Sequence, residues 1–150
     1  MEFCGIDPGK KGGIALIDED RRATSIEMPF KGGLLDIKKI KSLIEISDIV
    51  FIEEPIAMPK QSIKTARSSF TDYGKLLAII EICGVPYQEI KPSIWKKEYH
   101  LIKKDKKASV DLASQMFPNI IFFTERGRMM DGKAEALLLA DYALRKYNKK

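Results

Sequence analysis

The sequence predicts an α/β fold in which a mixed five-stranded sheet carries helices on both faces. Two features of the chain indicate it. Three short strand-like segments follow one another within the first 28 residues, separated by turn residues, which favours an antiparallel meander. Beyond residue 33, helical and strand-like patterns alternate, which favours βαβ crossovers with parallel pairing. Because 150 residues suit one compact core, we expect a single domain spanning 1–150.

The amino-terminal meander is built around a glycine-rich turn. We expect its strands at 3–7, 14–17 and about 23–28. The first strand ends in Asp7, and the turn that follows it contains Gly9, Gly12 and Gly13. Asp7 is therefore expected at the carboxyl end of a strand, directly before a tight turn.

The alternating part of the chain begins with apolar residues at helical spacing, which predict a helix over about 34–47. Residues 49–52 are continuously apolar, which is typical of a strand buried on both faces, and Glu53-Glu54-Pro55 ends it. We expect the rest of the chain to form a mobile loop at 59–69, a helix at 72–83, a strand at 85–90, helices from residue 92 and over 106–117, an irregular stretch at 118–132 and a closing helix at 132–147. This order matches an RNase H-like fold.

The chain is basic, with a formal net charge of +5 and a pI of about 9.1. Positive charge is concentrated between residues 91 and 107, where the only acids are Glu98 and Asp105. The lysines of this segment are Lys91, Lys96, Lys97, Lys103, Lys104, Lys106 and Lys107. Such a segment could hold a phosphate backbone, and the alternative is a lysine-rich, solvated helix face.

The sequence shows no pattern of export or membrane insertion. The first seven residues lack the basic and apolar regions of a signal peptide, and no stretch approaches the roughly 18 apolar residues of a spanning helix. Cys4 and Cys83 lie in apolar runs without a CxxC spacing, which indicates small buried side chains. We expect a cytoplasmic protein of a bacterial or phage-infected cell, with an organellar origin as the alternative, and no membrane partner.

Four acidic residues lie where a carboxylate needs a partner. Asp7 and Glu53 follow two strands that we expect to be parallel neighbours, and open α/β sheets bind ligands at that edge. Asp131 and Glu135 are four residues apart at a helix start, so they share one face of a markedly apolar helix. Taken singly, Asp7 could form only a turn, Asp131 could only cap the helix, and Glu135 could be partly exposed.

Together, the four carboxylates predict a divalent-metal site. Clustered carboxylates repel one another, and a bound cation relieves this repulsion. The sequence offers no His or Cys cluster, so oxygen ligands favour Mg²⁺ over zinc, with Mn²⁺ as a substitute. Two ions about 3.5–4 Å apart would suit the hydrolysis of a phosphodiester.

The motifs around these acids resemble those of RuvC-type Holliday junction resolvases, a family of the RNase H-like superfamily. Residues 5–9 (GIDPG) resemble the family's first motif, 51–53 (FIE) its second acidic motif, and Asp131 with 134–137 (AEAL) its carboxyl-terminal helix. The similarity runs nearly end to end. It looks closest to phage RuvC-like and plant chloroplast resolvases, in which Trp95-Lys96 also has a counterpart.

The resemblance implies an endonuclease that resolves four-way DNA junctions in recombination and repair. It implies that two Mg²⁺ ions would be bound by Asp7, Glu53, Asp131 and Glu135. It further implies that a basic residue at the start of the helix before Phe117 would contact the scissile phosphate. Lys106 fits that place, with Lys107 as the second candidate and an ordinary surface lysine as the alternative.

Two departures from the family pattern leave alternatives open. The best-known bacterial members place the last two acids three residues apart, with an aspartate second, whereas here Glu135 follows Asp131 by four residues. Asp131 is therefore the least secure ligand. The second motif offers the adjacent Glu53 and Glu54, whose side chains point to opposite faces of a strand. We prefer Glu53 because it follows the apolar run directly, and Glu54 is the alternative.

The segment 59–71 lies just after the second motif, and the resemblance places it near the junction centre. Arg67 and Phe70 could contact phosphate or stack on an unpaired base, and an ordinary surface loop is the alternative. The candidate DNA-binding residues are Lys60, Lys64, Arg67 and Phe70 here, with Lys103, Lys104 and Lys107 from the basic segment.

Symmetric cleavage of two strands implies a two-fold homodimer. The apolar residues Leu76, Leu77 and Ile80 form the candidate interface, although core packing explains them equally well.

Other functions compete with junction resolution. A related nuclease could cut RNA–DNA hybrids or other branched DNA, because the metal site would be shared and loops would read the substrate. An actin-like or sugar-kinase-like phosphate-binding domain also begins with a strand, an Asp and a glycine turn. That fold normally needs a second domain, and it has no use for Asp131 and Glu135. The four carboxylates argue against a catalytically silent nucleic-acid-binding module.

Overall fold

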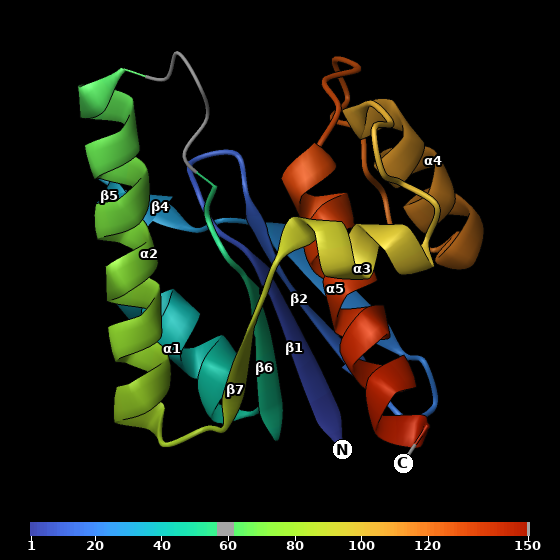
Figure 1. The fold of residues 1–150 in the computed structure, drawn as a ribbon, viewed down its shortest axis with the longest axis horizontal. Helices are drawn as coiled ribbons and strands as arrows, with labels where there is room; N and C mark the ends of the chain where they lie inside the picture. Colours follow the sequence, from blue (N-terminus) through green and yellow to red (C-terminus); the bar gives the residue numbers. More distant parts are fainter. Residues whose placement is uncertain (57–61, 150) are drawn as a thin grey trace.

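A mixed five-stranded sheet forms the centre of the molecule (Figure 1). The computed structural model describes residues 1–56 and 62–149. The strands of the sheet are β1 (Glu2–Asp7), β2 (Gly13–Asp18), β3 (Ala23–Glu27), β6 (Ile49–Glu53) and β7 (Tyr87–Ile90), in the order β3-β2-β1-β6-β7. The first three strands pair antiparallel, and the β1–β6 and β6–β7 pairs are parallel. The predicted meander followed by crossovers is confirmed.

Helices cover both faces of the sheet, as predicted. They are α1 (Ile37–Glu45), α2 (Ile63–Cys83), α3 (Pro92–Glu98), α4 (Lys106–Met116) and α5 (Asp131–Asn148). Alternate residues of β1 enter different cores: Phe3 packs with α5, whereas Cys4 and Ile6 pack with α1 and α2. Among the described residues, no helix is long and apolar enough to cross a membrane.

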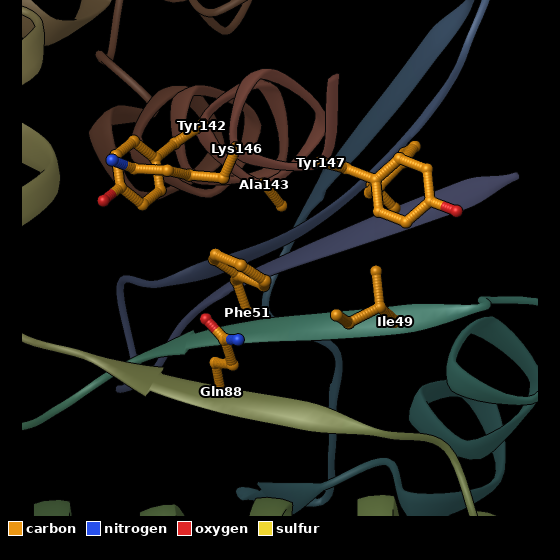
Figure 2. Close-up of a pocket in the computed structure, with 8 residues that line it drawn as sticks. Ile49, Phe51, Gln88, Tyr142, Ala143, Lys146 and Tyr147 are labelled. Carbon is orange, nitrogen blue, oxygen red and sulfur yellow. The ribbon is translucent and has the colours of Figure 1, made fainter. Parts of the chain in front are cut away.

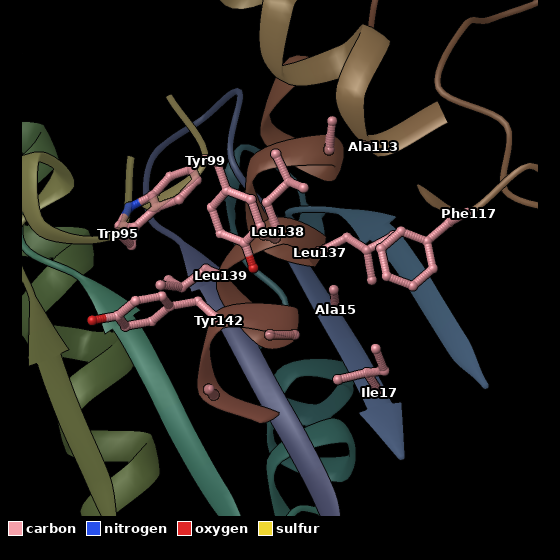
Figure 3. Packing of buried hydrophobic residues seen from close by; sticks show 14 of the residues in the cluster. Ala15, Ile17, Trp95, Tyr99, Ala113, Phe117, Leu137, Leu138, Leu139 and Tyr142 are labelled. Carbon is pink, nitrogen blue, oxygen red and sulfur yellow. The ribbon is translucent and has the colours of Figure 1, made fainter. Parts of the chain in front are cut away.

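Helix α5 is the most deeply buried helix of the fold. It crosses β1 and β2, and its residues from Ala134 to Leu144 are buried (Figure 3). The helix approaches β1 closely at Gly5, where an added Cβ would lie 2.2 Å from the carbonyl oxygen of Ala136. The absence of a side chain at Gly5 therefore brings the first turns of α5 close to the carboxyl end of β1.

The region between β3 and α1 differs from the prediction. Leu34 was expected in the helix, but Leu34–Leu35 form a short strand, β5, paired with β4 (Phe30–Lys31). Helix α1 begins only at Ile37, because the Asp36 carboxylate accepts a hydrogen bond from the Lys39 amide and caps the helix there.

The segment expected as a mobile loop up to Ser69 is also different. Helix α2 already begins at Ile63, and the Ser62 hydroxyl caps it by accepting a hydrogen bond from the Thr65 amide. The first turns face solvent on most sides, so they lack the apolar periodicity that would have indicated a helix. The predicted end of the helix is confirmed, with Gly84 in the left-handed conformation at φ 67°.

The predicted dimer interface lies largely in the core. Leu76 and Ile80 are fully buried and pack with Ile40 and Ile44 of α1, and Leu77 packs against the same cluster. Of the two explanations for these residues, core packing therefore holds for Leu76 and Ile80, which lie on the inner side of α2, and Leu77 is partly buried beside them.

Candidate metal and active site

Three of the predicted carboxylates meet at one edge of the sheet. Asp7 ends β1 and Glu53 ends β6, and these strands are parallel neighbours with Ile6 opposite Ile52. Glu135 reaches the same place from the second turn of α5. Each side chain offers an oxygen within 4.8 Å of the others. The parallel register aligns the two strand ends, and the close packing of α5 at Gly5 supplies the third carboxylate.

The electrostatics of the cluster favour a cation. Burial raises the pKa of Asp7 well above its usual value, and the neighbouring Glu53 and Glu135 raise it further. Burial also raises the pKa of Glu53, against the opposing effects of the Lys96 ammonium and the hydrogen bond from Trp95. The ionised cluster is therefore costly by itself, and a divalent cation bound between its oxygens would remove much of that cost.

Residues of α3 and α4 hold two of these carboxylates in place. The Trp95 indole N–H donates to Glu53 Oε2 at 2.7 Å. Lys96 Nζ donates to Glu135 Oε1 and Oε2 at 3.1 and 3.0 Å, and the Ser109 hydroxyl donates to Glu135 Oε1 at 3.0 Å. These contacts fix the orientation of both glutamates.

Trp95, Lys96 and Ser109 were not among the predicted site residues. The sequence signals for the first two were the counterpart of Trp95-Lys96 in the resembling chloroplast resolvases and, for Lys96, its place in the basic segment. Ser109 had no such signal, because its role depends on how α4 packs against α5.

Asp131 lies beside the cluster and outside it. It is the first residue of α5, one turn before Glu135, and it accepts a hydrogen bond from Lys106. The structure therefore brings together three of the four predicted ligands and pairs the fourth with a lysine. Glu54 is part of the cleft wall around Asp7 and Glu53, but it is not one of the three converging acids.

Lys106 lies close enough to the acidic cluster to influence it. Its hydrogen bond to Asp131 raises its own pKa, with further contributions from Asp131, Glu135 and Asp7. In turn, its charge lowers the pKa of Asp7 and of Glu53. Lys106 is thus at the site, and its ammonium is held by Asp131.

The remaining lysines of the basic segment have different surroundings. Lys107 forms an ion pair with Asp111 on its own helix, which offsets its charge. Lys103 and Lys104 are exposed in the connection between α3 and α4, where Lys103 adopts a φ of 59°. The segment is therefore not one uniform cationic face, since Lys96 and Lys106 are engaged with acids of the site.

The predicted DNA-binding residues of the next region lie on α2. Lys64, Arg67 and Phe70 are exposed on its first turns, and Phe70 is 46% exposed. They stand on a helix and not on a loop. Lys60 lies outside the described residues.

One of the hollows in the described part of the protein meets the acidic cluster, and another lies away from it. A cleft of about 330 Å³ is lined by Asp7, Glu53 and Lys96, among others. Figure 2 shows a separate groove of about 210 Å³ between α5 and the strands β6 and β7, with Phe51 and Tyr142 in its wall. Among the described residues, no carboxylate lines this groove, whereas Asp7 and Glu53 line the acidic cleft.

Comparison with known proteins identifies the fold. No protein-family model and no curated protein matches the sequence. Among solved structures, T. thermophilus RuvC in complex with a Holliday junction substrate matches with a TM-score of 0.62 at 14% identity, covering 99% of this chain and 96% of that one. A second Thermus thermophilus RuvC structure matches with a TM-score of 0.59 at 15% identity, covering 99% and 97%. The predicted RNase H-like, RuvC-type fold is thereby confirmed over nearly the whole chain.

Proposed function

We propose that this protein is a metal-dependent endonuclease that resolves four-way DNA junctions. The observation that carries the proposal is the convergence of the Asp7, Glu53 and Glu135 carboxylates at the carboxyl edge of parallel strands. The fold shared with T. thermophilus RuvC, which has been solved with a Holliday junction substrate, supports the choice of substrate. The basic character of the chain fits a polyanionic partner.

The residues at the cluster fit a hard divalent cation. The converging ligands are carboxylate oxygens, two of them with raised pKa values, and this is the donor set that Mg²⁺ and Mn²⁺ prefer. We propose two Mg²⁺ ions, held by Asp7, Glu53 and Glu135, with Asp131 as the fourth ligand. When bound, the ions would supply Lewis-acid polarisation of the scissile phosphate.

Neighbouring side chains orient the carboxylates that we propose as metal ligands. Trp95 orients Glu53, and Ser109 orients Glu135. Lys96 donates to both oxygens of Glu135, so a bound cation would replace or share this ammonium contact. Asp131 would exchange Lys106 for a cation, which would leave the Lys106 ammonium available to contact the negatively charged phosphate.

The test compares substrates of different shape. The purified protein is incubated with a mobile four-way junction, a linear duplex and an RNA–DNA hybrid, in Mg²⁺, in Mn²⁺ and in EDTA. We expect paired, symmetric nicks in the junction, and no cutting in EDTA. Preferential cleavage of the hybrid would reject the junction as substrate and favour a ribonuclease. Cutting in EDTA would reject the metal site.

Two matched variants assign the second ligand. Glu53→Gln should lose at least about 100-fold in cleavage rate, because it removes one converging charge, whereas Glu54→Gln should cut at nearly the parental rate. Both should bind the junction. The opposite result would make Glu54 the ligand. Asp7→Asn should likewise bind the junction without cutting it, and retained cleavage would exclude Asp7 from the mechanism.

We also propose a two-fold homodimer, since paired cuts need two active sites. The outer side of α2 exposes Gly74, Ala78 and Ile82 at four-residue spacing, and Ile82 is 77% exposed. A Cβ added to Gly74 would meet no atom within 4 Å. Small residues beside an exposed isoleucine allow a second helix to approach closely.

A further inference from the structure

A basic groove lies next to the acidic cleft, between the β1–β2 turn and the first turns of α2. It has a volume of about 620 Å³, and its lining includes Lys10, Lys11, Lys64, Ser68, Ser69 and Asp72. Lys10 and Lys11 are exposed residues of the turn that follows Asp7. Figure 1 shows this turn and the start of α2 at the same end of the sheet.

The groove and the acidic cleft adjoin each other. The β1–β2 turn passes from one to the other, because Asp7 and Pro8 line the cleft while Gly9 lines the groove. On the opposite wall, Ser69 of α2 lines both hollows. A polymer with a phosphate at the acidic cleft would therefore extend directly into the groove.

The charges of the groove are available to a ligand. Among the described residues, no ion pair involves Lys10, Lys11 or Lys64. Asp72 of the lining forms an ion pair with Lys75 at 3.4 Å. Among the described residues, no aromatic side chain lines the groove, which offers ammonium and hydroxyl donors in place of a stacking surface. This chemistry suits a phosphate better than a base.

The backbone holds the two turn lysines in place. The Gly12 amide donates to the Gly9 carbonyl at 3.0 Å, and the Met28 amide donates to the Gly12 carbonyl at 2.9 Å. The turn is also wedged against α5, since a Cβ on Gly132 would lie 1.9 Å from the Lys11 carbonyl oxygen. The turn is therefore a fixed support, and only the lysine side chains must be ordered on binding.

We infer that this groove binds the sugar-phosphate backbone of the substrate strand at a phosphate neighbouring the one that is cut, through Lys10 and Lys11. The inference rests on the proposed nuclease function, and it adds two residues to the DNA-binding surface. The groove fixes the strand along the β1–β2 turn, while the carboxylates act on the adjacent phosphate.

The experiment measures binding without cleavage. The double variant Lys10→Gln/Lys11→Gln is compared with Lys38→Gln/Lys39→Gln, an equal charge change at exposed residues of α1 that line neither hollow. Affinity for the junction and for a linear duplex is measured in EDTA over a salt series. We expect the first variant to bind about tenfold more weakly. The slope of log affinity against log salt concentration should decrease in magnitude by roughly 1–2, and the affinity of the control variant should change less than twofold.

A phosphate scan identifies the contact. Single methylphosphonates replace each phosphate within three nucleotides of the cut site, or at successive positions of the duplex. The wild-type protein should bind more weakly when one or two of these phosphates are replaced. Lys10→Gln/Lys11→Gln should bind the DNA modified at those positions as well as it binds unmodified DNA. Equal affinities of the two double variants, or full methylphosphonate sensitivity in Lys10→Gln/Lys11→Gln, would overturn the inference. Binding to the linear duplex is measured separately. If the protein bound junction and duplex equally well, the proposed substrate would be rejected, and the duplex data would still test whether the groove binds phosphate.

Discussion

At the residue scale, the free-energy cost of bringing ionised carboxylates together is clearest at Asp7, which is partly buried beside Glu53 and Glu135. Its pKa is raised in the folded protein, while the unfolded chain has an ordinary value of about 3.9. Between these two pKa values the folded state binds more protons than the unfolded state, so stability decreases as the pH rises through the folded pKa. The metal-free protein is therefore expected to be stabilised by mild acid.

This linkage gives a prediction for Asp7→Asn. In EDTA, the melting temperature of the wild-type protein should fall relative to that of Asp7→Asn as the pH is raised from about 5 to 8, because the variant removes the titrating charge. Saturating Mg²⁺ should reverse the difference at pH 8. Thermal melts followed by circular dichroism measure both effects. Asp20→Asn, at a side chain that is 76% exposed, serves as the control, and a parallel pH trend in wild type and Asp7→Asn would contradict the prediction.

In the metal-free protein, the ammonium of Lys96 offsets part of the negative charge of the carboxylate cluster. Its ammonium bridges both oxygens of Glu135, and the two side chains are only 24% and 10% exposed. Lys96→Met should therefore destabilise the metal-free protein by roughly 1–3 kcal/mol, because it leaves a buried carboxylate unpaired. Mg²⁺ should restore part of this loss, since a cation can replace the ammonium.

Chemical denaturation with and without Mg²⁺ measures this exchange. The matched control is Lys97→Met, which removes the exposed neighbouring lysine of α3 and should change stability by less than about 0.5 kcal/mol. An equal loss in both metal conditions would mean that Lys96 has a packing role only.

The site residues that could be predicted are those that differ in polarity from their neighbours in the sequence. Asp7 and Glu53 follow apolar strand segments, and Glu135 interrupts an apolar helix, so each carboxylate is conspicuous in its own neighbourhood. Trp95 and Ser109 reach the site through the packing of α3 and α4 against it, and a short stretch of sequence does not indicate how two helices pack. The pairing of Asp131 with Lys106 joins residues 25 positions apart and was equally hidden.

At the scale of elements, the strand pattern was more informative than the helix starts. Buried strands show continuous or alternating apolar residues, whereas the first turns of α2 are exposed and polar, and only the Ser62 cap indicates that a helix begins there. The short β4–β5 hairpin is stabilised by its pairing, and Leu34 fitted the helical spacing of α1 by coincidence. Exposure thus removes the periodicity on which helix prediction depends.

The contact between α5 and β1 is the element-level feature on which the site depends most. Gly5→Ala should destabilise the protein by about 1–3 kcal/mol and reduce cleavage, because the new Cβ would meet the Ala136 carbonyl oxygen at 2.2 Å and push Glu135 away. Denaturation and cleavage rates measure the two effects. Gly74→Ala, in open space on α2, should instead stabilise a dilute, monomeric sample by up to about 1 kcal/mol. Similar stability for the two variants would contradict this account of the close approach.

At the scale of the whole molecule, the order of strands and helices was sufficient to predict the fold. A meander can pair only antiparallel, and the two crossovers that follow place β6 and β7 parallel to β1, which leaves one edge where Asp7 and Glu53 end together. T. thermophilus RuvC shares this fold with a TM-score of 0.62 at 14% identity, so the fold is similar although most residue identities differ.

At the level of assembly, the sequence pattern left two explanations for the apolar residues of α2. Leu76 and Ile80 are fully buried in the core, so we place the proposed dimer contact on the outer side of the helix. Ala78→Arg combined with Ile82→Glu places charges on that side without touching the core. We expect a monomer by analytical ultracentrifugation, with a melting temperature changed by only a few degrees at equal protein concentration.

The catalytic consequence of losing the dimer is specific. Each monomer would retain its carboxylates and its ability to nick DNA, but the two cuts in a junction would become independent, because no partner would hold the second strand in register. A supercoiled cruciform plasmid distinguishes the cases, since paired cuts within one binding event give linear product, while independent cuts first accumulate nicked circles. Wild-type protein should give linear product, and Ala78→Arg/Ile82→Glu should give nicked circles at a similar initial rate. A dimeric variant, or a monomeric variant that still yields linear product directly, would place the functional interface elsewhere on the molecule.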